Sequence, residues 1–141
     1  MKRGLMMMAL GLAGCGSDSG TDGPSPVPVS GTWGWSQFVQ GGGASCGEGG
    51  TLTLTQSGSQ LGGSLSARGA CETPGLAVDF LRSGDVTSGT VDGAHLTFTI
   101  GVCHYDGTAV GNPVTQAGGT ATCTGLPGTT GALVGTWEIG Q

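Results

Sequence analysis

Charged residues are scarce in this 141-residue sequence, and basic residues are the scarcest of them. Only 9% of the residues are charged, with four Lys and Arg against nine Asp and Glu. Without a basic patch, the chain is a poor partner for nucleic acid or for anionic lipid headgroups. The low charge also argues against a disordered chain, because disordered segments are usually kept open by charge.

Residues and motifs for catalysis are equally few. The sequence has two histidines, His95 and His104, and it lacks G-x-S-x-G, Walker, G-x-G-x-x-G and H-E-x-x-H patterns. His104 and Asp106 share one strand face and come nearest to a metal or acid–base pair. The single asparagine, Asn112, precedes a proline and forms no glycosylation sequon. We therefore expect no enzyme, no cofactor and no metal site.

The N-terminus has the layout of an export signal. Met1-Lys2-Arg3 is a short positive region, and residues 4–12 form an apolar run too short to span a bilayer. The run ends in Leu12-Ala13-Gly14-Cys15, which resembles the bacterial lipobox. The resemblance implies that residues 1–14 are a signal peptide, cleaved before Cys15. It also implies that Cys15 carries acyl chains such as palmitate, several of which together anchor a protein stably in a membrane.

The residues after Cys15 indicate the location and the spacer. Gly16 follows the cysteine where an aspartate would resemble an inner-membrane retention signal, which favours the outer membrane. Residues 15–29 are rich in Gly, Ser and Asp and end in a Pro-x-Pro-x-Pro run, so we expect a flexible tether that stiffens toward the barrel. Loss of the leader leaves Arg68 and Arg82 against nine acidic residues, a formal charge of −7.

From residue 30 onward the apolar residues alternate with Thr and Ser, a period that predicts strands and no helix. The expected strands are 32–39, 51–56, 60–70, 86–91, 94–102, 104–110, 114–124 and 133–139. Short turns join them, which predicts an all-β domain over 30–141, either an up-and-down antiparallel barrel of about eight strands or a sandwich. Residues 73–84 are one irregular stretch, expected to be a long loop, a short strand or a helical turn.

The four cysteines beyond the lipobox are expected to form two disulfides, because an even number in an exported chain favours oxidation. A two-residue loop at 58–59, extended as a ladder without a bulge, places Cys46 opposite Cys71 at a spacing that a disulfide can bridge. Cys103 and Cys123 then pair by elimination. The absence of a C-x-x-C spacing argues against zinc.

Both predicted hairpins keep their apolar residues on one face. In the hairpin that turns at 58–59, Leu52 faces Leu65. Asp92-Gly93 is a strong signal for a type I′ turn and, as the loop of a second hairpin, places Val91 opposite Ala94. The parity of that register then gathers one apolar face: Val91, Ala94, Leu96, Phe98 and Ile100.

Two Gly-Thr-Trp triplets carry a family resemblance. Gly31-Thr32-Trp33 opens the first strand, and Gly135-Thr136-Trp137 lies in the last. A Gly-x-Trp in the first strand is similar to the start of lipocalins and avidins, the calycin barrels, and residues 50–58 look like their early hairpins. The resemblance implies a closed barrel whose first and last strands pair. It covers the fold only, because the late arginine of lipocalins is missing and the biotin-holding residues of avidins have no matching positions.

Three aromatic residues are the candidates for a binding site. Trp35 and Phe38 lie in the first strand near an expected barrel mouth, and Phe80 lies in the irregular stretch 73–84. The expected function is an envelope-anchored, non-catalytic module for a small apolar ligand or a protein partner. The alternatives are a protease inhibitor that uses Pro24–Val29 as its arm and a purely structural envelope protein. A barrel interior filled by leucine and aromatic side chains would count against the small ligand.

Overall fold

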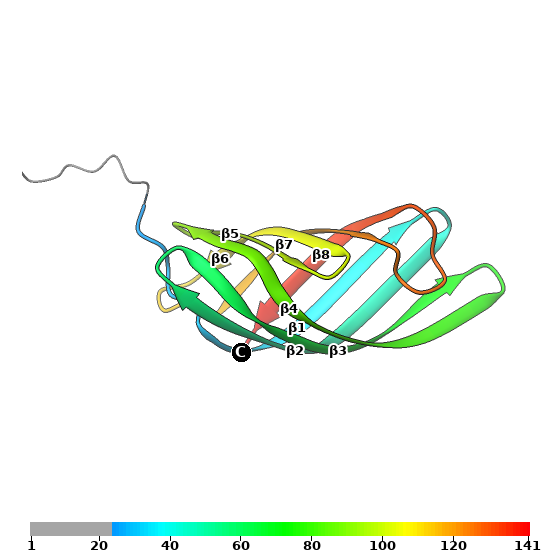
Figure 1. The fold of residues 1–141 in the computed structure, drawn as a ribbon, viewed down its shortest axis with the longest axis horizontal. Coiled ribbons are helices and arrows are strands. Elements are labelled where there is room, and N and C mark those ends of the chain that lie inside the picture. The colour runs from blue at the N-terminus through cyan, green and yellow to red at the C-terminus, as the bar shows by residue number, and fades with distance from the viewer. Residues whose placement is uncertain (1–23) are drawn as a thin grey trace, which may run out of the picture.

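The computed structural model describes residues 24–141, in which all regular structure is β-strand. Eight antiparallel strands follow one another around a closed barrel, and β1 closes it by pairing with β8 (Figure 1). The strands are β1 (Gly31–Gly41), β2 (Ala44–Ser57), β3 (Gln60–Thr73), β4 (Leu76–Asp92), β5 (His95–Ile100), β6 (Cys103–Val110), β7 (Gln116–Thr124) and β8 (Ala132–Gly140). The predicted up-and-down barrel is confirmed, and so is the pairing of its first and last strands.

The barrel interior is filled by the apolar half of the alternating strands. Four aromatic side chains meet there, with ring centroids 4.9 to 6.1 Å apart: Trp35, Phe98, Tyr105 and Trp137. Phe98 and five aliphatic side chains around it are each at most 2% exposed: Leu52, Leu54, Leu65, Leu96 and Ile100. Burial of this apolar area is the main force that holds the barrel together.

Both predicted disulfides are present. The β2–β3 hairpin turns at residues 58–59, and its register runs without interruption to Cys46 opposite Cys71. Cys103 and Cys123 face each other across β6 and β7 in the same manner. In each bridge the two Cα atoms are 4.1 Å apart, the close spacing typical of a non-hydrogen-bonded antiparallel pair.

The β4–β5 hairpin turns one residue later than predicted. Its loop is Gly93-Ala94 rather than Asp92-Gly93, so Val91 pairs with Leu96 and not with Ala94. Gly93 has a φ of 58°, whereas Asp92 is not among the residues with positive φ. A type II′ turn needs positive φ only at its first central residue, and glycine there is the least strained choice. Because the loop moves by one residue in both strands, the parity holds. Val91, Leu96, Phe98 and Ile100 are buried as predicted, whereas Ala94 lies in the turn and is only partly buried.

β4 differs most from the sequence prediction. The stretch 73–84 is neither a loop nor a helical turn, because Thr73 pairs with Leu76 across a tight turn and the strand continues to Asp92. Inside this strand the apolar Phe80 and Leu81 are adjacent, and they point to opposite faces. That adjacency hid the period of two. The remaining predicted strands are shifted by a few residues at their ends or are longer than expected.

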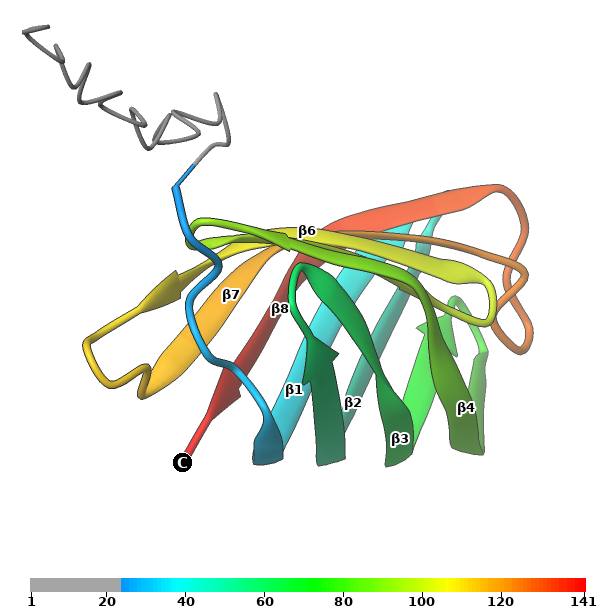
Figure 2. The same cartoon turned by 60° about the vertical axis from the view of Figure 1, so that its left-hand side comes forward.

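The segment Pro24–Val29 packs across one end of the barrel (Figure 2). Val29 is fully buried, and its N–H donates to Gln56 Oε1 at 2.8 Å. Trp33 Nε1 donates to the Val29 carbonyl at 2.9 Å, and the Val27 N–H donates to the Gly93 carbonyl at 2.9 Å. The packed part of the chain therefore starts before the boundary expected at residue 30. The predicted signal peptide and the first part of the tether, residues 1–23, lie outside the described residues.

Candidate functional site

The two ends of the barrel are built differently. The Pro24–Val29 arm covers one end, which we call the arm end. The other end, which we call the mouth, is bordered by the turns at 42–43, 74–75 and 101–102 and by the loop 125–131. Leu126 of that loop is buried, and the β3–β4 hairpin projects past the β5–β6 hairpin (Figure 1). The polar cluster and the strand edge described next lie at or just beneath the mouth.

A hydrogen-bonded cluster of polar side chains lies inside the barrel beneath the mouth. Arg82 Nη1 donates to Glu48 Oε1 at 2.6 Å, and Arg82 Nη2 donates to Tyr105 Oη at 2.7 Å. The Tyr105 hydroxyl donates to Gln37 Oε1 at 2.5 Å. The four residues, which we call the Glu48–Arg82 cluster, connect β1, β2, β4 and β6 across the interior.

The charges of the Glu48–Arg82 cluster are almost completely removed from solvent. The side chains of Arg82 and Glu48 are 11% and 1% exposed. Trp35 Nε1 donates to the same Glu48 oxygen as Arg82, at 2.9 Å. The second oxygen, Oε2, is buried and has no hydrogen-bond partner among the described residues. The cluster joins a carboxylate, a guanidinium, a phenol and an amide, and it ties four strands together through side chains.

Tyr105 has a strongly shifted ionisation. Burial raises the pKa of its hydroxyl to about 12, against the opposing effect of the adjacent Arg82 charge. Because the raised pKa favours the neutral hydroxyl, its contribution to stability is complete below pH 10, the pKa of a free tyrosine. The contribution is lost as pH rises from about 10 to about 12, which amounts to roughly 2–3 kcal/mol.

We therefore expect an alkaline loss of stability that can be followed at one residue. Tyr105 is the single tyrosine of the chain, so the ultraviolet absorbance of tyrosinate reports this group alone. The folded protein should titrate near pH 12 and the denaturant-unfolded protein near pH 10. Tyr105→Phe should abolish this part of the pH dependence of unfolding. A folded-state midpoint near 10 would show that the hydroxyl is solvated.

One strand edge at the mouth has no partner strand. The β3–β4 ladder starts at Leu76, whereas β5 reaches β4 only at the pair Val86 and Ile100. Among the described residues, Leu76–Asp85 is therefore paired on one side only, and we call its other side the β4 edge. Arg82 Nη2 donates to the Ile100 carbonyl at 3.1 Å, which satisfies the backbone where β5 ends.

The backbone groups of the β4 edge can be assigned residue by residue. Cys71 is in a non-hydrogen-bonded pair with Cys46, so its own N–H and C=O point toward β4 and meet Val78. The direction alternates along β4, so Phe80 and Arg82 also bond to β3. The residues that alternate with these three direct their N–H and C=O groups away from β3, to the unpaired side: Ala77, Asp79, Leu81 and Ser83.

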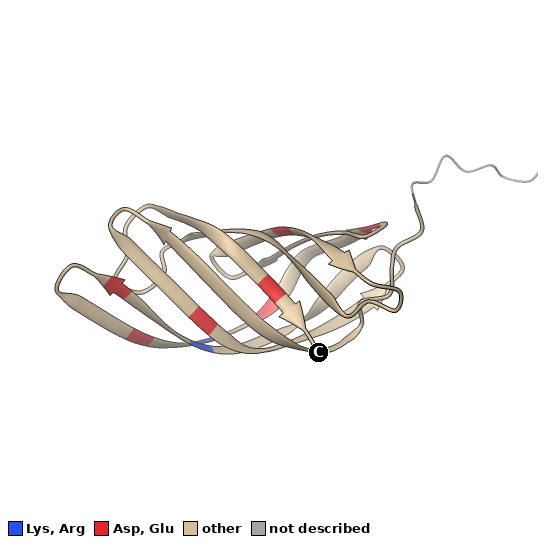
Figure 3. Ribbon diagram, turned by 180° about the vertical axis from the view of Figure 1, so that it is seen from behind, with Lys and Arg blue, Asp and Glu red and all other residues tan. Residues whose placement is uncertain are grey.

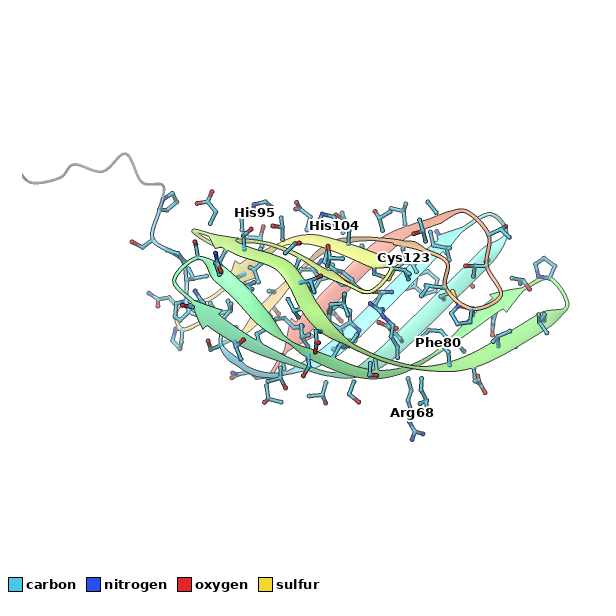
Figure 4. The ribbon with its side chains drawn as sticks, in the orientation of Figure 1. Arg68, Phe80, His95, His104 and Cys123 are labelled. Carbon is cyan, nitrogen blue, oxygen red and sulfur yellow. A yellow bond between two sulfur atoms is a disulfide. The ribbon has the colours of Figure 1, made fainter. Side chains whose placement is uncertain are left out.

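The side chains beside the β4 edge are unusually exposed for their type. Leu81 is 77% exposed, more than any other large apolar side chain in the described part of the chain. It stands opposite Arg68 on the outer face, between two open depressions of about 560 and 500 Å³. Arg68 points away from the barrel (Figure 4). On the inner face, the Phe80 ring lies over Gly69, where a Cβ atom would come within 2.5 Å of Phe80 Cζ.

The three aromatic candidates lie in three different environments. Trp35 is 4% exposed, and its indole is committed to Glu48 inside the barrel. Phe38 is 50% exposed on the outer face of β1, opposite Gly47. Phe80 is partly buried against the core and belongs to the strand that carries the β4 edge. The structure thus brings Phe80, and neither of the other two, next to the unpaired edge.

The suggested pair of His104 and Asp106 does not form. Asp106 Oδ1 lies 2.9 Å from His95 Nε2, and both side chains are 51% exposed. His104 Nδ1 instead lies 3.2 Å from Thr99 Oγ1, and both histidines are on the outside of β5 and β6 (Figure 4). Within residues 24–141, no group of three or more His, Cys, Asp or Glu side chains is arranged to hold a metal ion.

The sequence analysis missed the Glu48–Arg82 cluster. Glu48 lies between the expected strands 32–39 and 51–56, and Arg82 lies in the stretch 73–84 that was expected to be irregular. A signal was present, because Glu48 lies two residues after Cys46 and four before Leu52, and so shares their inward face. A carboxylate at an inward position of a small barrel requires a buried cation, and Arg68 and Arg82 are the cations of the described chain.

No family model, curated protein or solved structure matches this chain. The closed eight-stranded barrel is shown by the structure and does not depend on a known relative. The likeness to calycins within that fold and the lipobox at Cys15 remain predictions from the sequence, and Cys15 lies outside the described residues. No helix in the described part of the chain is long and apolar enough to cross a membrane.

Proposed function

We propose that this protein is an envelope lipoprotein, held at the outer membrane by acylated Cys15, whose barrel binds a protein partner without catalysis. The observation that carries the proposal is the β4 edge, where unpaired backbone groups lie beside the exposed Leu81. An open strand edge with an apolar side chain favours pairing with another chain, and proteins usually cover or shield such edges. A partner that docks there would cover these unpaired backbone groups.

The filled interior supports a protein partner over a small apolar ligand. Ligand-binding barrels need an internal space of several hundred cubic ångströms, lined mostly by apolar groups. Here the central volume is occupied by packed aromatic rings and leucines, and the layer above it by the Glu48–Arg82 cluster. The two larger depressions instead lie on the wall, on either side of Leu81 and Arg68.

The alternative of a protease inhibitor with a free N-terminal arm receives less support. Val29 is fully buried, and the backbone of Val27 is hydrogen-bonded to both Gly93 and Gln56. An arm that enters a protease cleft must present an extended, accessible backbone, and this arm is already committed to its own barrel. The arm end is therefore assigned to closing the barrel, and the mouth to binding.

The proposal is tested by site-specific photocrosslinking in the cells that produce the protein. A photoreactive phenylalanine analogue at Leu81 should give a covalent adduct with a partner protein, because this side chain projects beside the β4 edge. The same analogue at Thr120, an exposed residue of β7, is the matched control and should give none. Absence of an adduct at Leu81, with the protein present at normal levels, would remove the assigned binding surface.

The anchoring half of the proposal is tested in the same cells. The unaltered protein should sediment with the outer-membrane fraction and carry the added mass of acyl chains at its N-terminus. Cys15→Ser should abolish the acylation and release the protein from the membrane, with the four barrel cysteines still oxidised. Recovery of Cys15→Ser in the membrane fraction would show that lipid is not the anchor.

A further inference from the structure

We propose that the β4 edge accepts an extended segment of the partner as an additional antiparallel strand, and that this segment alternates basic and apolar residues. The inference rests on the proposed function, since it names the chemistry of the partner that binds at the mouth. Three features of the edge support it: its backbone groups, the two faces it presents to an added strand, and its charge.

The backbone of the β4 edge specifies a strand rather than a helix or a loop. Ala77, Asp79, Leu81 and Ser83 each offer an N–H and a C=O in the strand direction, without a partner strand among the described residues. An added strand satisfies all of these groups together, and the main-chain hydrogen bonds supply most of the affinity in this mode of recognition. The ladder ends where β5 joins β4, at Val86, which limits the added strand to about seven residues.

The inner and outer faces of the edge favour different side chains on an added strand. Val78 and Phe80 point inward and are only partly buried, and Gly128 of the loop 125–131 lies against Val78. Inward-facing residues of an added strand therefore have Phe80 and Val78 as apolar neighbours, beside this loop. Asp79 and Asp85 point outward and are exposed, with Leu81 between them. Basic side chains opposite these carboxylates form cross-strand pairs of opposite charge, whereas acidic ones are repelled. The favoured segment therefore carries Lys or Arg outward and aliphatic residues inward.

The charge of the whole chain points the same way. Acidic residues are spread over the barrel and few basic positions accompany them (Figure 3). Of the two described arginines, Arg82 is already paired with Glu48. A second copy of this chain would carry the same net negative charge as the first, formally −5 for the full sequence. A basic partner is attracted by that field, and a second copy is repelled.

The test uses a synthetic peptide, acetyl-Lys-Val-Lys-Val-Lys-Val-Lys-amide, labelled with fluorescein and titrated with the full-length protein in nonionic detergent. Anisotropy should show saturable binding, and hydrogen exchange at the Asp79 and Leu81 amides should slow when the peptide is bound. The same peptide with Glu in place of Lys should bind at least about tenfold more weakly, because its carboxylates face Asp79.

Backbone methylation of the peptide separates strand addition from simple charge attraction. In an antiparallel pair the outward-facing residues opposite Asp79 and Leu81 direct their N–H groups toward β4. Methylation of the backbone nitrogens of the lysines should therefore abolish binding. Methylation of the backbone nitrogens of the valines should leave the affinity within about threefold of that of the unmodified peptide. Equal effects of the two methylated peptides would overturn the inference. Protection of the same amides by protein dimerisation alone, without peptide, would make a second copy the occupant and would also overturn it.

A matched pair of variants provides the test on the protein side. Leu81→Pro removes an N–H that points away from β3, so the β3–β4 ladder should persist and peptide binding should fall at least about tenfold. Leu81→Ala keeps the N–H and should bind within about threefold. Equal binding by Leu81→Pro, with a native β-sheet spectrum, would overturn the inference. An adduct at Leu81 in cells together with a peptide that fails to bind would leave the proposed function standing and reject strand addition alone.

Discussion

Replacement of Arg82 by methionine should destabilise the barrel by about 3–5 kcal/mol, one of the two largest effects we expect from the structure. Methionine fills a similar volume but cannot donate a hydrogen bond. Glu48, whose side chain is 1% exposed, would keep only the indole N–H of Trp35 as a partner. Tyr105 and the Ile100 carbonyl would each lose a donor as well. The measurement is denaturant unfolding followed by tryptophan fluorescence.

The double variant Arg82→Met with Glu48→Met is the control for this prediction. Removing both charges leaves no buried carboxylate unpaired, and buried ion pairs replaced by apolar side chains are often neutral or stabilising. The double variant should therefore be more stable than Arg82→Met alone by at least about 2 kcal/mol. If Arg82→Met costs less than about 1 kcal/mol, Glu48 is reached by water in solution and the pair is not a buried one.

The Glu48–Arg82 cluster also lies directly behind the proposed binding edge. Arg82 belongs to the same strand as Leu81 and reaches inward to Glu48 and Tyr105 while its neighbour projects outward. Within the described chain, residues 76–85 of β4 have no partner strand on that side, so this cluster ties this half of β4 to β2 and β6 through side chains. An edge that stays open for a partner needs such a support, because unpaired edges are otherwise prone to fray or to aggregate.

The sequence was most informative where a local rule fixes a long-range pairing. The turn at 58–59 sets the register of β2 and β3, and from it the pairing of Cys46 with Cys71 follows by counting. Turn chemistry was less reliable at Asp92-Gly93, because two types of turn compete for the same glycine and differ by one residue in the loop. The parity of the buried face was still correct, since the shift moves both strands together.

The candidate site was harder to predict because it depends on what is missing from the fold. The open β4 edge exists only because β5 ends at Ile100 while β4 starts at Leu76, and strand lengths are not readable from a pattern of alternation. The ion pair of Glu48 with Arg82 joins residues that are distant in sequence, from strands that are not neighbours in the sheet. The sequence did single out the stretch around Phe80, but as an irregular segment that could be a long loop, a short strand or a helical turn, whereas it belongs to one long strand.

Loss of either disulfide should be the second large effect on stability, and the two should differ. Replacing both cysteines of one bridge by alanine restores the chain entropy of the unfolded state, a cost of about 3 kcal/mol for loops of this length. The sequence separations of 25 and 20 residues are close enough that loop entropy alone predicts nearly equal losses. The glycine-rich unfolded chain has much entropy to recover, which makes both losses substantial.

The contacts of the sulfur atoms make the expected losses of stability differ between the two disulfides. Gln37 Nε2 donates to Cys123 Sγ at 3.4 Å, and Gln37 is buried in the Glu48–Arg82 cluster. Alanine at Cys103 and Cys123 would leave that amide without its partner, so this double variant should lose about 1 kcal/mol more than the Cys46 and Cys71 variant. Denaturant unfolding of the two variants, side by side, measures the difference. A larger loss from the Cys46 and Cys71 variant would show that the amide finds another acceptor and that Gln37 is free to turn within the core.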